Sequence, residues 1–166
     1  RCLGGQTARD GTHHMKIKER VKAHRAALGP LKKMLLKKVD VKLQGKMVFV
    51  DSMANSTLLH NAHKWGKLNA ANWKDLSVAM LTGCRAAANM GVKLQDDDAF
   101  GNSTDAEVMS TVARLPVQEQ VGVARLKFYQ RVLKVASKSV LQLLDLQILE
   151  NCNFATNIVK DFDWMK

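Results

Sequence analysis

Apolar residues recur at spacings of three and four along most of this chain, which is the periodicity of one buried face of an α-helix. The two clearest stripes are Leu43, Met47, Val50, Ala54 and Leu58, and then Val117, Val121, Ala124, Phe128, Val132 and Val135. Only two prolines occur, Pro30 and Pro116, and both stand where a helix can begin. The sequence therefore predicts an all-α fold, a helical bundle of about six to eight helices. Residues 1–11 are glycine-rich and predict a short irregular or β-hairpin N-terminus.

Capping and breaking residues predict where these helices begin and end. Thr12 can cap a first helix that runs to about Leu28 and is closed by Gly29-Pro30. A short second helix is expected to bury the side chains of Leu31, Met34 and Leu35. Further helices are expected after caps at Asp40, Asn69 and Thr104, the last in a capping box with Glu107, and over residues 141–149 and 154–164. A loop is expected over roughly 90–103. The helix after Asn69 is expected to bury Trp73, Ser77, Met80, Cys84 and Ala87.

Excess positive charge is confined to the first part of the chain. The whole chain has a formal net charge of +11. Residues 1–70 hold 15 basic and 4 acidic side chains, whereas residues 71–166 hold 11 of each. The densest part, residues 16–38, carries nine Lys and Arg against a single acid, Glu19. Such one-sided charge indicates a polyanionic partner, either nucleic acid or an anionic membrane surface.

The composition around this basic cluster favours nucleic acid. Lys and Arg bind phosphates without reading the base sequence. Aromatic residues that could stack on bases are missing nearby, so contacts to the phosphate backbone are expected rather than single-strand stacking. The apolar face lacks the Trp and Phe of a membrane-surface helix, and no apolar run is long enough to span a bilayer. The predicted nucleic-acid contacts are Lys16, Lys18, Arg20, Lys22, Arg25, Lys32, Lys33, Lys37 and Lys38.

Four short patterns could carry chemistry, and each has a simpler structural explanation. The stretch 49–52 is superficially similar to the metal-binding strand of polymerases, but it lacks a second aspartate and fits a helix better. His60 and His63 are spaced as neighbours on a helix, with no Cys close in sequence to complete a zinc site. The aspartates at 96–98 have no glycine-spaced calcium loop around them, and Cys84 lies on an apolar stripe. The sequence therefore predicts no catalytic residue, metal or cofactor in this chain.

The cysteines predict a cellular compartment, and the first residue bears on whether the chain is part of a longer protein. Cys2, Cys84 and Cys152 are odd in number and far apart, which predicts reduced thiols and an intracellular protein of the nucleus or cytoplasm. The chain opens with Arg1 and not with an initiator Met, which indicates a fragment of a longer protein.

A series of short motifs follows one another along the chain. They are Cys2-Leu3-Gly4, Asp10-Gly11, the Arg- and Ala-containing stretch 17–28, Lys46 with LLHNAHKW at 58–65, the stretch from Leu68-Asn69 to Arg85, the segment 105–133 with Leu115-Pro116 and ARLKFYQRVL, and VKDFDWM at 159–165. In order and spacing they resemble the region just after the catalytic palm in reverse transcriptases of non-LTR (LINE-type) retrotransposons. Cys2 stands where that family has an aromatic residue, and His60 and His63 where it has Tyr and Glu.

The resemblance implies a specific role. Residues 1–11, with Leu3 and Gly4, would end the palm near the primer grip. Residues 12–90 would form the basic thumb, a helical bundle that closes on the RNA/DNA template–primer duplex, and residues 91–166 a post-thumb helical region. The catalytic aspartates and their Mg²⁺ would lie in the upstream palm domain of the parent protein. This chain alone would then bind template–primer for an RNA-directed DNA polymerase without polymerising DNA itself.

The residues by themselves leave a second hypothesis open. A stand-alone helical protein-interaction module could carry the same basic face only for solubility. Steep weakening of duplex binding with salt would distinguish nucleic-acid binding from this alternative.

Overall fold

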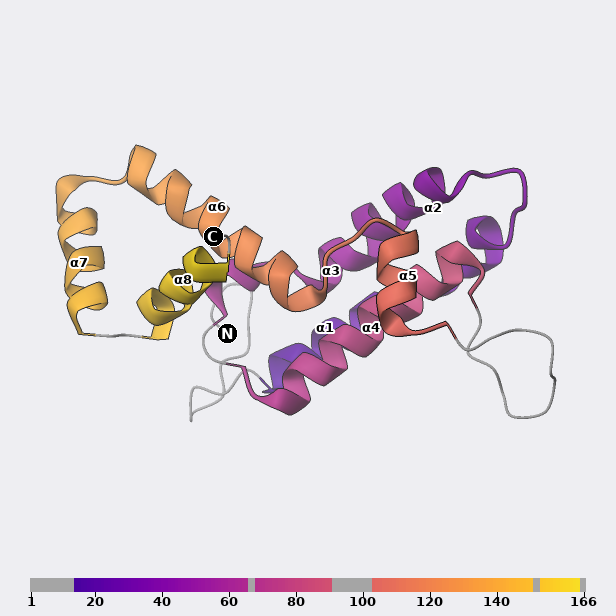
Figure 1. Cartoon of the computed structure of the whole chain (residues 1–166), viewed down its shortest axis with the longest axis horizontal. Helices are drawn as coiled ribbons and strands as arrows, with labels where there is room; N and C mark the ends of the chain where they lie inside the picture. The colour runs from indigo at the N-terminus through magenta and orange to yellow at the C-terminus, as the bar shows by residue number, and fades with distance from the viewer. Residues whose placement is uncertain (1–13, 66–67, 91–102, 151–152, 165–166) are drawn as a thin grey trace. The chain divides into compact units, whose positions relative to one another are not determined.

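The computed structural model describes residues 14–65, 68–90, 103–150 and 153–164 (Figure 1). Regular structure in these ranges is helical and includes no strand, which confirms the predicted all-α fold. The predicted N-terminal segment with Leu3 and Gly4, the Thr12 cap and the aspartates at 96–98 lie outside the described residues. The chain packs as two compact units, unit 1 of residues 1–60 and 74–116 and unit 2 of residues 61–73 and 117–166. The division at residues 11 and 90, which comes from the resemblance, stays a prediction.

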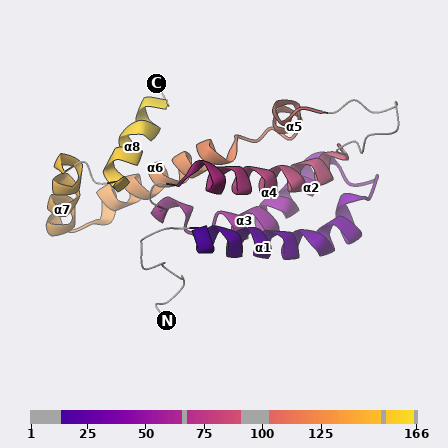
Figure 2. The same ribbon diagram turned by 90° about the horizontal axis from the view of Figure 1, so that it is seen from below.

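Unit 1 is built from four successive helical segments. Helix α1 (His14–Leu31) continues into a π-helical turn, η1 (Lys32–Leu36). Helix α2 (Leu43–Phe49), the π-helical turn η2 (Val50–Asn55) and the short α3 (Ser56–Leu58) follow one another without a break, and η2 and α3 pack against α1. Most of α4 (Ala70–Ala88) and the short α5 (Asp105–Thr111) complete the unit. In Figure 1 the α4 ribbon partly covers α1, and Figure 2, turned by 90°, shows the two helices running alongside each other.

The core of unit 1 uses the apolar stripes that the sequence indicates. Of the stripe that begins at Leu43, four members are at most 1% exposed: Met47, Val50, Ala54 and Leu58. From α4, Met80, Cys84 and Ala87 are buried as predicted, whereas Trp73 and Ser77 are only half-buried. Leu76 is fully buried in their place, three residues after Trp73 and four before Met80. The helical period was therefore correct, with the centre of the face shifted toward Leu76.

The expected end of the first helix at Gly29-Pro30 is wrong, because α1 runs through both residues to Leu31. A proline inside a helix costs about 3 kcal/mol in lost hydrogen bonding and ring contact. Burying a leucine contributes about 1.5–3 kcal/mol, and the continued helix buries both Leu31 and Leu36. These two side chains offset the proline. The wider π-helical turn also explains why Met34 is 74% exposed and not inward-facing, since it places the next buried residue five positions after Leu31.

Three of the predicted caps lie in the described residues, and two of them are confirmed. The backbone N–H of Asn72 donates to Asn69 Oδ1 at 2.8 Å. At α5 the Glu107 N–H donates to Thr104 Oγ1 (3.2 Å) and the Thr104 N–H to Glu107 Oε2 (2.7 Å), which is the predicted capping box. The Asp40 cap is wrong, because α2 begins at Leu43, where the buried stripe begins, and its N-cap residue is Lys42.

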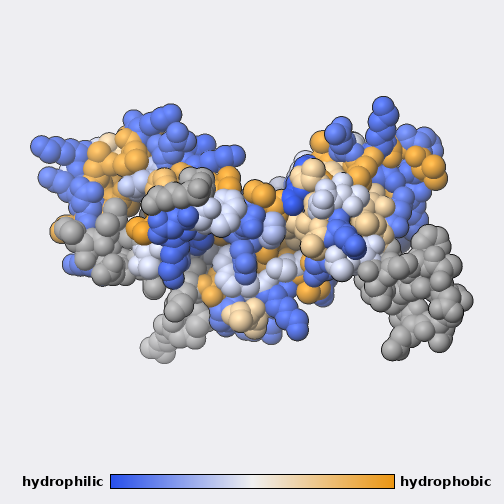
Figure 3. Space-filling model, in the orientation of Figure 1, coloured by the Kyte–Doolittle hydropathy of each residue, from blue (hydrophilic) through white to orange (hydrophobic). Residues whose placement is uncertain are grey.

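Unit 2 is built around one long helix. Helix α6 (Val117–Val135) packs against α8 (Asn153–Trp164) and the 3₁₀ turn η3 (Ala62–Lys64), and α8 also contacts α7 (Lys138–Leu149). The buried side chains include Trp65, Leu68, Val117, Val121, Leu126 and Ile158. Both predicted C-terminal helices are present as α7 and α8. Apolar side chains also reach the surface of the described residues, as the orange areas of Figure 3 show.

A buried ion pair joins α6 to α8. Arg125 Nε donates to Asp161 Oδ2 at 2.7 Å and Arg125 Nη2 to Asp161 Oδ1 at 3.0 Å. The two side chains are only 8% and 13% exposed. Gly122 makes room for the carboxylate, because a Cβ at that position would lie 3.0 Å from Asp161 Oδ1. This pair could not be predicted from local sequence patterns, because Arg125 and Asp161 lie 36 residues apart.

Candidate nucleic-acid interface

Two hollows lie along α4 in unit 1, one against α1 and one against its continuation η1, and we call them together the α1–α4 seam. The first hollow is lined by Lys18, Val21, Lys22, Arg25 and Asp75. The second hollow is lined by Lys32, Leu36, Lys37, Thr82, Arg85, Ala86, Asn89 and Met90. Gly83 lets α4 pack closely on η2, because a Cβ there would lie 3.1 Å from a Val50 methyl, whereas His24 Nε2 of α1 would be at an ordinary contact distance of 3.7 Å.

The seam gathers five of the nine predicted contacts on one side of α1. Lys18, Lys22 and Arg25 follow the i, i+4, i+7 spacing that places side chains on one helical face. All three are exposed, and none of them forms an ion pair with another described residue. Lys32 and Lys37 lie further along and line the second hollow. At about 1.5 Å per residue, the basic line from Lys18 to Lys32 is about 21 Å long.

The other four predicted contacts are arranged differently. Lys33 and Lys38 are exposed but line neither hollow, and Lys16 is half-buried with interactions of its own. Arg20 lies away from the seam and is used within the fold. Its Nη1 donates to the Thr57 carbonyl at 3.5 Å, and its Nη2 lies 3.1 Å from His60 Nδ1. Five of the nine predicted contacts therefore lie together along the seam, and four do not. The sequence alone provides no basis for distinguishing the two groups.

The electrostatics of unit 1 favour an anion. Its described residues contain fourteen Lys and Arg against six Asp and Glu. Two of these acids are already paired inside the unit, Asp51 with Arg114 and Asp105 with Arg85. Asp75 is the acid that lines the first hollow. The seam thus presents an excess of positive charge along its whole length.

A chain of polar side chains holds α1 in place behind the seam. His24 Nε2 lies 3.2 Å from Asn55 Oδ1, and Asn55 Nδ2 donates to Asp51 Oδ1 at 2.8 Å. Asp51 Oδ2 in turn accepts from Arg114 Nε and Nη2 at 2.8 and 2.6 Å. Because Asn55 uses its amide N–H groups toward Asp51, its oxygen accepts from His24, which puts the imidazole proton on Nε2. Burial lowers the pKa of His24 and keeps this neutral form in the folded protein.

These hydrogen bonds show the structural role of Asp51. The stretch 49–52 is helical, as predicted, and the Asp51 carboxylate is engaged by Arg114 and Asn55. Sequence reasoning missed the pair with Arg114 because the partner is 63 residues away. Cys84 is fully buried, in agreement with its predicted place in the core, and burial raises the pKa of its thiol to about 11.

The expected arrangement of His60 and His63 as neighbours on one helix is wrong. The chain turns between them at Asn61, which has a left-handed φ of 60°. His60 lies beside Arg20, whereas the His63 ring stacks on Phe128 of α6 with ring centroids 4.4 Å apart. Among the residues that the structure describes, no group of three or more His, Cys, Asp or Glu is placed to hold a metal ion.

None of the helices in the described ranges combines the length and the apolar character needed to cross a membrane. Comparisons with protein-family models, with curated proteins and with solved structures find no match.

Proposed function

We propose that the chain binds a nucleic-acid duplex through its phosphates along the α1–α4 seam. The observation that carries this proposal is the alignment of Lys18, Lys22 and Arg25 on one exposed face, followed by Lys32 and Lys37 on the same side. Lys and Arg along a groove neutralise phosphates and release condensed counterions, which supplies most of the affinity of sequence-independent binding. The helix that carries Lys18, Lys22 and Arg25 buries its opposite face, so the backbone holds the Cα atoms of these cations at a regular helical spacing.

The lining of the seam favours a duplex backbone over a run of stacked bases. Neither hollow has an aromatic residue in its wall. Proteins that bind single strands along their length usually stack successive bases on aromatic side chains. The first hollow therefore offers charge to phosphates and little to bases.

The resemblance gives this duplex a more specific identity. A thumb fragment of a non-LTR retrotransposon reverse transcriptase would hold the RNA/DNA template–primer beside an upstream palm. The helical fold and the basic seam support this proposal, and the catalytic aspartates and Mg²⁺ would then belong to the palm. The alternative is a protein-interaction module in which the basic residues only confer solubility.

A salt titration of the full chain with an RNA/DNA hybrid tests the proposal against this alternative. The logarithm of the association constant is expected to fall linearly with the logarithm of salt concentration. Each phosphate contact contributes close to 0.9 to the slope for B-form DNA, so five cations predict a slope of about −4.5. Fluorescence anisotropy of a labelled hybrid measures it. A flat response, or no binding at low salt, would support the interaction module instead.

A further inference from the structure

The second hollow of the seam differs chemically from the first, because apolar side chains form part of its wall. Its volume is about 450 Å³. Leu36, Ala86 and Met90 contribute the apolar surface, and Lys32 and Lys37 the charge. Pockets of this size hold small molecules. The first hollow has the same volume but only one apolar residue, Val21, in its wall, so the apolar wall and not the size suits the second hollow to a ligand that has an apolar part besides its phosphate.

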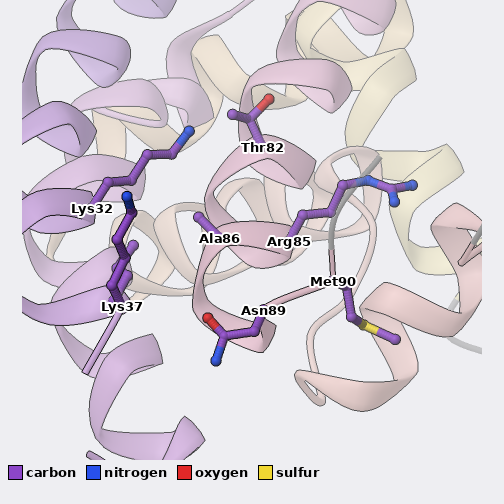
Figure 4. A pocket seen from close by; sticks show the side chains of 8 residues that line it. Lys32, Lys37, Thr82, Arg85, Ala86, Asn89 and Met90 are labelled. Carbon is purple, nitrogen blue, oxygen red and sulfur yellow. The ribbon is translucent and has the colours of Figure 1, made fainter. Parts of the chain in front are cut away.

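The polar groups around the hollow are unequal. Figure 4 shows Lys32 and Lys37 extending from one wall, with the Asn89 amide on the opposite one. The Arg85 guanidinium points away from the two lysines and donates to Ser103 O (3.1 Å) and Asp105 Oδ1 (2.5 Å). Arg85 therefore contributes mainly its aliphatic stem. The two lysines are the groups that can bind an anion here.

We infer that the second hollow binds one unpaired nucleotide. Its phosphate lies against the ammonium groups of Lys32 and Lys37, and its base lies against the apolar side chains of Leu36, Ala86 and Met90. The Asn89 amide has both donors and an acceptor and can bond to a base edge. This inference rests on the proposed function, because a duplex bound at the first hollow is what delivers the nucleotide. Lys32 lies about 10 Å beyond Arg25 along the helix. A duplex on the first hollow thus brings a strand end to the second.

Binding of three DNA duplexes by the full chain tests this inference. One is blunt, one carries a single-stranded overhang, and the third carries the same overhang with abasic sites, which keep the phosphates but lack the bases. The overhang duplex is expected to bind about tenfold more tightly than the blunt duplex, since it buries one base on apolar surface. The abasic overhang is expected to bind between the other two, because its phosphates still reach Lys32 and Lys37 but no base is buried. Equal binding of all three would overturn the inference.

Competition with AMP separates the two sources of an unpaired nucleotide. If AMP in excess removes the overhang preference without displacing the blunt duplex, the hollow also takes free nucleotides. If AMP does not remove a preference that depends on the base, the hollow is specific for strand ends. Both results keep the base in the hollow.

Neighbouring lysines provide a matched pair of variants. Lys37→Ala is expected to reduce the overhang preference, whereas Lys38→Ala removes the same charge beside the hollow and is expected to leave it unchanged. Ala86→Phe fills the hollow without altering charge and should abolish the preference while blunt-duplex binding persists, with helicity by circular dichroism as the folding control. If Lys37→Ala and Ala86→Phe both keep the overhang preference, the nucleotide site is contradicted but the proposed duplex binding is not. If the unmodified chain binds none of the three duplexes, the proposed function itself is contradicted.

Discussion

Replacing Lys18, Lys22 and Arg25 together by alanine is expected to weaken duplex binding about 10- to 100-fold at moderate salt. Each exposed charge pair contributes about 0.5–1 kcal/mol, and about 1.4 kcal/mol corresponds to a factor of ten in affinity. The slope of the salt dependence should also become shallower by about 2.7, because three phosphate contacts are lost. Anisotropy titration of the triple variant over a range of salt concentrations measures both quantities.

Helix α6 offers a matched control for this triple variant. Lys127, Arg131 and Lys134 have the same i, i+4, i+7 spacing, are exposed and belong to unit 2. Replacing these three by alanine changes the net charge of the chain by the same amount. Duplex affinity and salt slope are expected to stay near their original values. Equal losses in the two triple variants would mean that net charge, and not the seam, governs binding.

The second large effect is expected from the buried ion pair of unit 2. Asp161→Ala should lower the free energy of unfolding of unit 2 by about 3–5 kcal/mol, because it leaves the Arg125 charge buried without its carboxylate. All three tryptophans, Trp65, Trp73 and Trp164, belong to unit 2. Urea unfolding followed by tryptophan fluorescence therefore reports on the unit that carries the change.

Two further variants make this stability prediction specific. Asp105→Ala also removes an aspartate paired with an arginine, but that carboxylate is 70% exposed and its loss should cost at most about 1 kcal/mol. Because Asp105 lies in unit 1, which contains no tryptophan, urea unfolding of both aspartate variants is also followed by circular dichroism. Replacing both members of the buried pair, as Arg125→Met with Asp161→Leu, should be less destabilising than Asp161→Ala, since no unpaired charge is left behind. Similar losses for Asp161→Ala and Asp105→Ala would show that the buried pair has no special role.

The helices could be predicted from the sequence because the signals for them are local. The stripe from Met47 to Leu58, the Asn69 cap and the Thr104–Glu107 capping box each depend on residues a few positions apart. The error at Pro30 has a different origin. The cost of the proline is visible in the sequence, but the burial of Leu31 and Leu36 that offsets it depends on tertiary packing.

The candidate site was predicted only in part, for the same reason. The basic cluster could be found from composition. That Arg20 bonds to Thr57 and His60 instead of lining the seam depends on how η2 and α3 pack against α1, which the sequence does not show. The pairs Asp51–Arg114 and Arg125–Asp161 join residues too far apart in sequence for any periodic pattern to connect them. The second hollow requires α4 to lie beside α1, and its Thr82, Ala86 and Asn89 carry no signal of their own.

Protection of individual lysines from acetylation tests most directly whether the α1–α4 seam is the duplex-binding surface. The full chain is acetylated with and without a saturating blunt duplex, and mass spectrometry gives the modification rate of each lysine. Our proposal predicts slower modification of Lys18, Lys22 and Lys37 in the complex, with unchanged rates at Lys127, Lys134 and Lys138, which are exposed in unit 2. Protection of the unit 2 lysines without protection of those along the seam, or equal protection of both sets, would contradict it.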